Sequence, residues 1–198
     1  MPVQESPTGD SRCPVHGDVT PVQAFGTPST ESTRAYAGQS RLPIWLPWPL
    51  PHAWIISGIG HAGRGFAAAR ATVLACSGPN PVGGQADLLV VTEEPGVGLG
   101  ARYAGLAAAD PGAEVGRGVA HVKPEVDGHL TPMWCVRGAA GNRAVYAGEA
   151  DGRWLWLILH PESAGALLME PLSLVDLRDL GAEIELLPFG PVCQRLLD

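Results

Sequence analysis

The chain has 198 residues, of which 45% are hydrophobic, so it has enough apolar material to build the core of one domain. Its formal net charge is −7, with 13 Lys and Arg against 20 Asp and Glu, and this balance argues against binding to the phosphate backbone of nucleic acids. The longest strongly apolar run, residues 154–159, is far shorter than the ~20 residues of a membrane-spanning helix. We therefore expect a soluble, cytoplasmic protein with no nucleic-acid or membrane partner, and the oligomeric state stays open.

Residues 1–41 are rich in Ser, Thr, Pro, Gly and Gln and show almost no hydrophobic periodicity. Such a segment buries too little apolar surface to offset the entropy lost on ordering. The sequence predicts a mobile N-terminal tail over residues 1–41 and a single domain over residues 42–198.

The domain begins with the stretch "LPIWLPWPLPHAW", residues 42–54, which holds four prolines and three tryptophans. Because proline lacks a backbone N–H, this stretch cannot be an ordinary helix or a central strand, and residues that precede proline favour extended backbone. We predict an extended strap that leads Trp54 into the first strand. Trp45 and Trp48 either cover the sheet and complete its core or present a surface to a protein partner, since tryptophan is enriched at interaction hot spots.

Six β-branched or apolar runs follow the strap and predict six strands, at residues 53–60, 70–78, 86–94, 130–138, 143–150 and 153–160. Asp151 and Gly152 suit a tight hairpin turn between the last two. Residues 153–160 are apolar on both alternating faces, which predicts an interior strand.

Two short helices are expected, one around residues 99–106 and one at 161–169. Beyond them we expect a helix or turn that ends near Gly181 and then a strand at 183–187. The predicted fold class is α+β, with a mainly antiparallel sheet and short helices.

The two halves of the domain share a local pattern. Pro51 and Trp54 at the start of the first strand resemble Pro132 and Trp134 in the fourth, and Arg70-Ala71 resembles Arg143-Ala144. This pattern suggests two degenerate βββα halves related by a pseudo-twofold axis. The alternative is coincidence, because any β-rich chain offers such matches.

The strap, the run "RATVLACSGPNPVGGQADLLVVTEEPGVGLGARYAG" and the run "RAVYAGEADGRWLWLILHPESAGALLM" together resemble an actinobacterial family, a domain of unknown function. The resemblance covers roughly residues 13–197. Some members are called phosphotransacetylases, but those enzymes are longer two-domain proteins, and their phosphate and coenzyme A sites have no match in these residues. Family members commonly carry a Cys-x-x-Cys pair before a segment that ends in Cys-x-Val-His-Gly. This chain keeps Cys13, His16 and Gly17 and lacks the earlier pair.

Four types of candidate chemistry remain. Cys13 and His16 supply only two of the four ligands of a structural zinc site, so we expect no metal. Gly96, Gly98 and Gly100 lie between a strand and a helix, where free amides can cradle an anion, with Arg102 nearby. Alternatively, this glycine turn only lets the helix pack closely on the sheet.

A dispersed set of nucleophiles and bases consists of Cys76, Ser77, His61, His160 and Glu149, although Cys76 also suits a small apolar core position. The fourth candidate is the strap with Trp45 and Trp48. The leading interpretation is a non-enzymatic binding or regulatory module without a cofactor. The alternative is a small enzyme that acts on a phosphorylated or acyl metabolite and holds its anion at the glycine turn.

Overall fold

The computed structural model describes residues 4–5, 11–13, 17–19, 22–24, 26–139 and 141–197. The strands are β1 (Gln4–Glu5), β2 (Ser11–Cys13), β3 (Gly17–Val19), β4 (Val22–Ala24), β5 (Trp45–Pro47), β6 (Ile55–Gly63), β7 (Ala69–Pro79), β8 (Gln85–Glu93), β9 (Glu125–Val126), β10 (His129–Leu130), β11 (Met133–Cys135), β12 (Ala144–Ala150), β13 (Arg153–His160) and β14 (Ser173–Asp176). The α-helices are α1 (Thr30–Gln39) and α2 (Leu99–Ala104), and the 3-10 helices are η1 (Phe66–Ala68), η2 (Glu162–Met169), η3 (Leu177–Asp179), η4 (Gly181–Leu186) and η5 (Gln194–Leu196).

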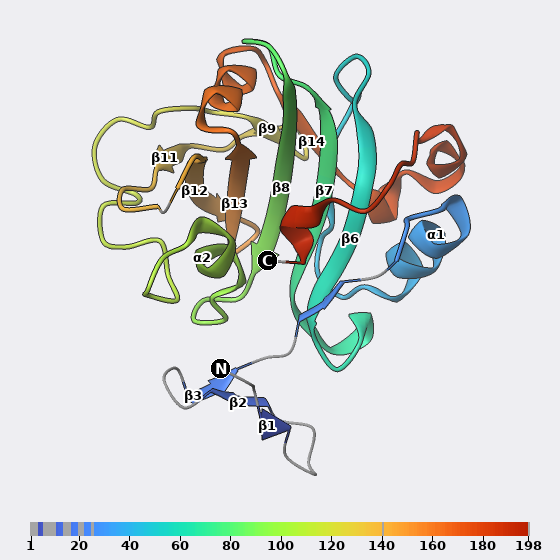
Figure 1. Ribbon diagram of the computed structural model, residues 1–198, viewed down its shortest axis with the longest axis horizontal. Helices are drawn as coiled ribbons and strands as arrows, with labels where there is room; N and C mark the ends of the chain where they lie inside the picture. Colours follow the sequence, from blue (N-terminus) through green and yellow to red (C-terminus); the bar gives the residue numbers. More distant parts are fainter. Residues whose placement is uncertain are drawn as a thin grey trace.

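The main element is a seven-stranded sheet with the order β11-β12-β13-β8-β7-β6-β4, in which every neighbouring pair is antiparallel. Figure 1 shows its long strands side by side. All six predicted strands lie in this sheet, and β13 is an interior strand with residues 155–159 fully buried. Asp151 and Gly152 have φ angles of 53° and 70°, the left-handed backbone of a two-residue hairpin turn. The α+β class with a mainly antiparallel sheet is confirmed.

A second sheet has the order β10-β9-β14-β5, and its one parallel pair is β14 with β9. The strap supplies β5, which is an edge strand paired with β14 on one side only. An edge position explains how Pro47 is tolerated inside a strand, because a proline there costs no ladder hydrogen bond. Strands β1, β2 and β3 form a separate antiparallel sheet.

Two cores lie on opposite faces of the seven-stranded sheet. One lies between this sheet and the four-stranded sheet, and it contains Leu74 and Leu157 together with Trp45 and Leu174. The other lies beneath α2 and the C-terminal residues and contains Trp156. Each long strand therefore contributes alternate residues to each core, which is why these strands read as continuously apolar.

Helix α1 lies inside the segment that the sequence analysis assigned to the tail. Ser29 and Ser32 form a reciprocal capping box at its start, and its residues Thr33 and Ala37 are buried. Tyr36 stacks on Phe66 with 4.6 Å between ring centroids. The serine-rich composition predicted a mobile segment, but two of its serines cap a helix that packs one face against the domain.

The prediction for residues 173–187 was wrong in its order. Strand β14 comes first, and the expected strand at 183–187 is the 3-10 helix η4. The apolar residues there share no strand face, because Ile184 is buried while Leu186 is exposed. The predicted helix at 161–169 is the 3-10 helix η2.

The strand order agrees with the predicted repeat, whereas the helices do not. The meanders β6-β7-β8 and β11-β12-β13 meet at the antiparallel pair β8–β13. A twofold axis perpendicular to the sheet between these strands would exchange the meanders and keep each face of the sheet on its own side. However, α2 packs in the core that contains Trp156, while η2 places Ala164 in the core on the opposite face.

Candidate functional site

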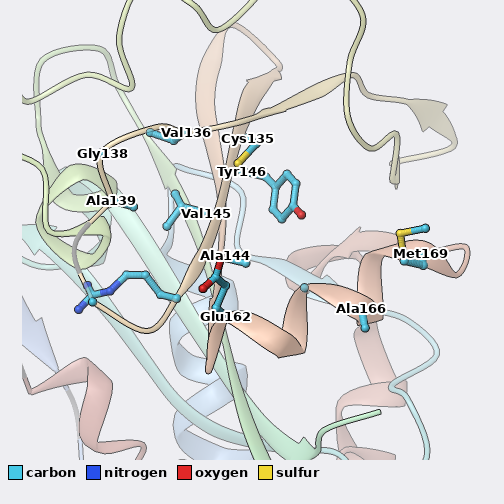
Figure 2. Close-up of a pocket in the computed structure, with 13 residues that line it drawn as sticks. Cys135, Val136, Gly138, Ala139, Ala144, Val145, Tyr146, Glu162, Ala166 and Met169 are labelled. Carbon is cyan, nitrogen blue, oxygen red and sulfur yellow. The ribbon is translucent and has the colours of Figure 1, made fainter. Parts of the chain in front are cut away.

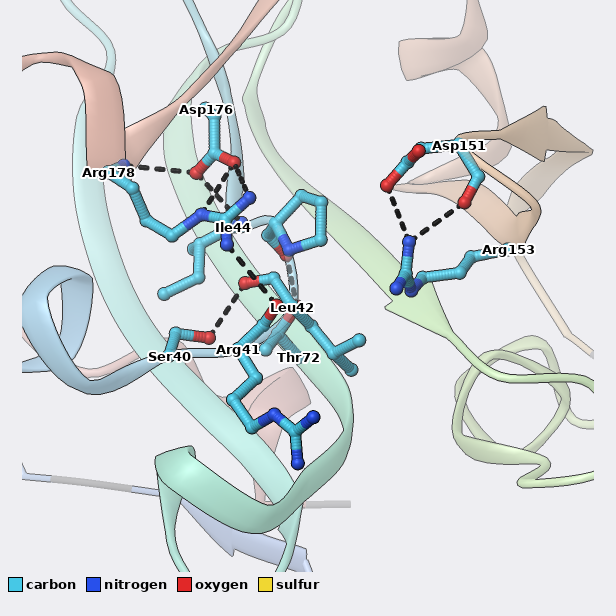
Figure 3. Close-up of polar contacts among 10 residues, drawn as sticks. Ser40, Arg41, Leu42, Ile44, Thr72, Asp151, Arg153, Asp176 and Arg178 are labelled. Carbon is cyan, nitrogen blue, oxygen red and sulfur yellow. Dashed lines mark hydrogen bonds and ion pairs between the residues drawn. The ribbon is translucent and has the colours of Figure 1, made fainter.

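The strap is held in place by side chains and backbone from distant parts of the chain (Figure 3). The Thr72 hydroxyl donates to the Pro43 carbonyl over 2.7 Å. The Ile44 amide donates to Asp176 Oδ1 over 3.3 Å, and the Leu177 amide donates to the Ile44 carbonyl over 2.9 Å. The first part of the strap is therefore integrated into the fold.

The two strap tryptophans differ in exposure. Trp45 is 5% exposed and belongs to the core, whereas Trp48 is half-buried and packs against that core. Of the two, Trp48 is therefore the one with ring surface left for a partner.

The glycine turn before α2 already holds carboxylates of the chain itself. The Leu99 and Gly100 amides donate to Glu93 Oε2 over 2.6 and 3.3 Å, and the Gly96 amide donates to Asp110 Oδ1 over 3.0 Å. A Cβ atom at position 100 would lie 2.3 Å from Trp156 Nε1, so Gly100 permits close packing of α2 on the sheet.

Glu93 itself is fully buried, and its Oε1 has no hydrogen-bond partner within the described structure. Burial raises the pKa of Glu93 to about 7, and the Gly100 and Leu99 amides oppose the rise. Arg102 is exposed on α2. Anion binding at this turn stays a prediction, and the carboxylates that its amides bond in the structure are those of Glu93 and Asp110.

The proposed nucleophiles and bases are only partly brought together. Ser77 Oγ lies 2.7 Å from Asp87 Oδ1 and 2.7 Å from Ser57 Oγ, and His160 lies opposite Asp87 on the next strand. Along its own strand, each of Ser77, Asp87 and His160 lies an even number of positions from a residue of the core that contains Trp156. Side chains alternate between the two faces of a strand, so these three side chains lie on the same face of the sheet as Trp156.

The other candidates lie apart from that cluster. Burial raises the pKa of the Cys76 thiol, with the neighbouring Cys193 adding to the rise, so Cys76 stays protonated. His61 is buried against Phe66, and burial lowers its pKa. Glu149 is exposed near the other end of the β12–β13 hairpin.

A cleft of about 490 Å³ lies where β11 and β12 meet η2 (Figure 2). Small residues form much of its wall: Gly138, Ala139, Gly141, Ala144, Gly165 and Ala166. A Cβ atom at position 165 would lie 3.1 Å from the Ala144 Cβ and 3.5 Å from the Tyr146 hydroxyl, so Gly165 brings η2 close to β12. The Glu162 amide donates to Asn142 Oδ1 over 3.0 Å and ties the start of η2 to the facing loop.

Besides Arg143, whose Nη1 donates to the Tyr103 carbonyl, three polar side chains line this cleft, from Cys135, Tyr146 and Glu162. Figure 2 shows the Tyr146 ring beside Cys135. Burial raises the pKa of Tyr146, and Cys135 and Glu162 add to the rise, so the phenol is a neutral hydrogen-bond donor at pH 7. Cys135 and Glu162 are exposed.

Sequence reasoning did not single out these three residues. Cys135 and Tyr146 lie directly opposite each other on β11 and β12, but two predicted strands show no register before they pair. The only signal was the excess of small residues at 138–144, which is also typical of an ordinary loop.

Within the described residues, no group of three or more His, Cys, Asp or Glu side chains is arranged to hold a metal ion. The proposed pair of Cys13 and His16 is not part of that statement, because His16 lies outside the described residues. The helices of the described segments include none that is long and apolar enough to cross a membrane.

The fold and its sites define an α+β protein whose seven-stranded antiparallel sheet has a core on each face. The model of a family of unknown function, DUF6758, matches residues 3–196, and the chain belongs to that family. No curated protein and no solved structure matches the chain.

Proposed function

We propose that the protein is a non-enzymatic binding module and that a small organic ligand occupies the cleft beside η2. The observation that carries this proposal is the cleft volume of about 490 Å³ around a partly buried phenol. Small-molecule sites typically enclose about 300–1,000 Å³ and combine apolar walls with a few polar groups. The cleft meets both conditions.

The side chains specify the chemistry of this ligand. The Tyr146 hydroxyl is a donor suited to a carbonyl or ether oxygen, and the Glu162 carboxylate accepts from a hydroxyl or an amine. The lining holds one positive side chain, Arg143, and one negative side chain, Glu162, so their formal charges cancel. The glycine and alanine walls leave room for an apolar body of modest size.

A screen of neutral and charged fragments by thermal shift, followed by titration under NMR, tests this function. We expect fragments that bind the wild type to lose affinity in Tyr146→Phe, which keeps the ring and removes the donor. Tyr36→Phe is the matched control, because Tyr36 stacks on Phe66 at α1 and does not line the cleft. Fragments that bind Tyr146→Phe and the wild type equally, or a screen without hits, would contradict the proposal.

The strap offers a second binding surface, for a protein partner. The half-buried ring of Trp48 supports this role, since tryptophan is the residue most enriched at interaction hot spots. Affinity purification from the native host with wild type and Trp48→Ala would test it. Loss of a specific partner with only a small decrease in melting temperature is the expected result.

An enzyme that acts on a phosphorylated or acyl metabolite is the alternative function. The contact between Ser77 and Asp87, with His160 opposite, is the observation that favours it. Loss of a detected hydrolase or transferase activity in Ser77→Ala, with the fold intact, would move the assignment to this alternative.

A further inference from the structure

A second pocket, of about 360 Å³, lies near the end of the seven-stranded sheet where β8 finishes. Its lining includes three arginines, Arg41, Arg70 and Arg153, and one carboxylate, Glu94. The cleft beside η2 starts near Ala144, at the other end of the β12–β13 hairpin from Arg153. The rise of about 3.3 Å per residue along β13 separates the two pockets by roughly 20 Å.

The strand register explains how these charges meet. Glu93 pairs with Ala71 on β7 and with Trp154 on β13, so Glu94 lies in one cross-strand row with Arg70 and Arg153. Direct cross-strand neighbours have Cβ atoms about 4.5–5.5 Å apart. Arg41, directly before the strap, lines the same pocket together with Leu42.

The charges of the pocket do not cancel. Arg70 Nε bonds Glu94 Oε2 over 2.9 Å, and Arg153 Nη1 bonds Asp151 Oδ2 over 2.5 Å. Among the residues that the structure describes, no carboxylate pairs with the Arg41 guanidinium. Three arginines against Glu94 and Asp151 leave one net positive charge, in a chain whose formal net charge is −7.

The ion pair of Arg70 is also easily exchanged. The Arg70 and Glu94 side chains are 52% and 47% exposed, and exposed ion pairs contribute little to stability. A guanidinium is suited to planar, bidentate recognition of carboxylate and phosphate oxygens. An incoming anion would therefore meet the Arg41 guanidinium, which has no acidic partner, and the Arg70 guanidinium, whose exposed ion pair with Glu94 it can replace.

We propose that the pocket of Arg41, Arg70 and Arg153 is a binding site for a small anion, a phosphate or carboxylate group carried by a metabolite. Arg41 is its principal ligand, and Glu94 is the internal competitor that the anion displaces from Arg70. This site is separate from the cleft beside η2, and it does not depend on the function proposed for that cleft.

The test is a titration of the full chain with inorganic phosphate and, separately, with acetate, each at constant ionic strength against chloride. Binding is followed by the NMR signals of the arginine side chains and by calorimetry. We expect saturable binding to the wild type that is weakened about tenfold or more in Arg41→Gln, the scale of one lost charge-assisted hydrogen bond. We expect Glu94→Gln to tighten binding several-fold, an effect that a merely structural role for the pocket would not produce.

Arg137→Gln is the matched control. It makes the same change in net charge, and Arg137 is 85% exposed and does not line the pocket. Saturation by phosphate alone assigns a phosphate group, and equal saturation by acetate assigns a carboxylate group. Absence of saturation in the wild type, or equal weakening in Arg137→Gln and Arg41→Gln, overturns the proposal.

Discussion

Glu93 shows how one buried side chain can make the stability of this fold depend on pH. The carboxylate accepts hydrogen bonds from two amides at the start of α2, but burial still raises its pKa from the ordinary value of 4.5 to about 7. Between these two pH values the folded chain holds a proton at Glu93 that the unfolded chain has released. Stability from this group is therefore fully present below pH 4.5 and is lost as the pH rises through about 7.

Glu93→Gln removes this titration and keeps an oxygen that accepts from the amides. We expect the difference in unfolding free energy between wild type and variant to shift by about 3 kcal/mol against the wild type from pH 4 to pH 8. Urea unfolding at several pH values measures it. A constant difference across that range would show that Glu93 titrates normally in the folded protein.

At Gly100, close packing against Trp156 dictates the identity of the residue. Because a Cβ atom there would lie 2.3 Å from the Trp156 indole, Gly100→Ala should destabilise the fold by about 1–3 kcal/mol, the usual cost of overpacking.

Gly38 is the matched control for this substitution, since it also lies in a helix but a Cβ atom added there would meet nothing within 4 Å. Gly38→Ala should stabilise the fold by up to about 1 kcal/mol through helix propensity. Thermal unfolding measures both variants. Equal effects of the two substitutions would exclude close packing as the role of Gly100.

At the scale of elements, the strap places one tryptophan in the core and a second, three residues later, at the partly exposed edge of that core. β5 is an edge strand whose Trp45 side chain lies in the core, and the half-buried Trp48 follows directly after it. Trp45→Ala should cost about 3–5 kcal/mol, as expected for truncation of a buried aromatic side chain.

Trp48→Ala should cost clearly less, because the Trp48 side chain is only partly buried. The midpoints of urea unfolding for the two variants provide the comparison. If Trp48→Ala is the more destabilising change, Trp48 is a core residue and the proposed partner surface is not available.

At the scale of the whole molecule, the sequence predicted the large sheet because its strands are long. Runs such as "RWLWLILH" are apolar on both alternating faces, and that pattern identifies an interior strand without knowledge of its partners. The four-stranded sheet was not predicted, since its strands have only two to four residues and β14 pairs with β5 from a distant part of the chain. Too few side chains alternate in such strands to establish a period.

The candidate sites were predictable to different degrees. Arg70 and Arg153 each adjoin the start of a predicted strand, and in an antiparallel order with β8 between them both starts lie at the same end of the sheet. That reasoning would have brought the two arginines together, but only after the strand order was known. The position of Arg41 depends on how the chain packs at the start of the strap, and the cleft depends on how the 3-10 helix η2 packs against β12. No local sequence pattern encodes such packing.

The arrangement of the two sheets predicts where the molecule resists local opening. Strands β8 and β13 each have a hydrogen-bonded neighbour on both sides and buried side chains on both faces, so their amides should exchange with solvent only when the whole fold opens. β10 is an edge strand of the smaller sheet, and both of its side chains are exposed. Hydrogen exchange followed by mass spectrometry or NMR should show the slowest amides in residues 154–159 and much faster exchange at His129 and Leu130. Amides in β10 that are protected as strongly as those in β13 would mean that the two sheets open only together, as one cooperative unit.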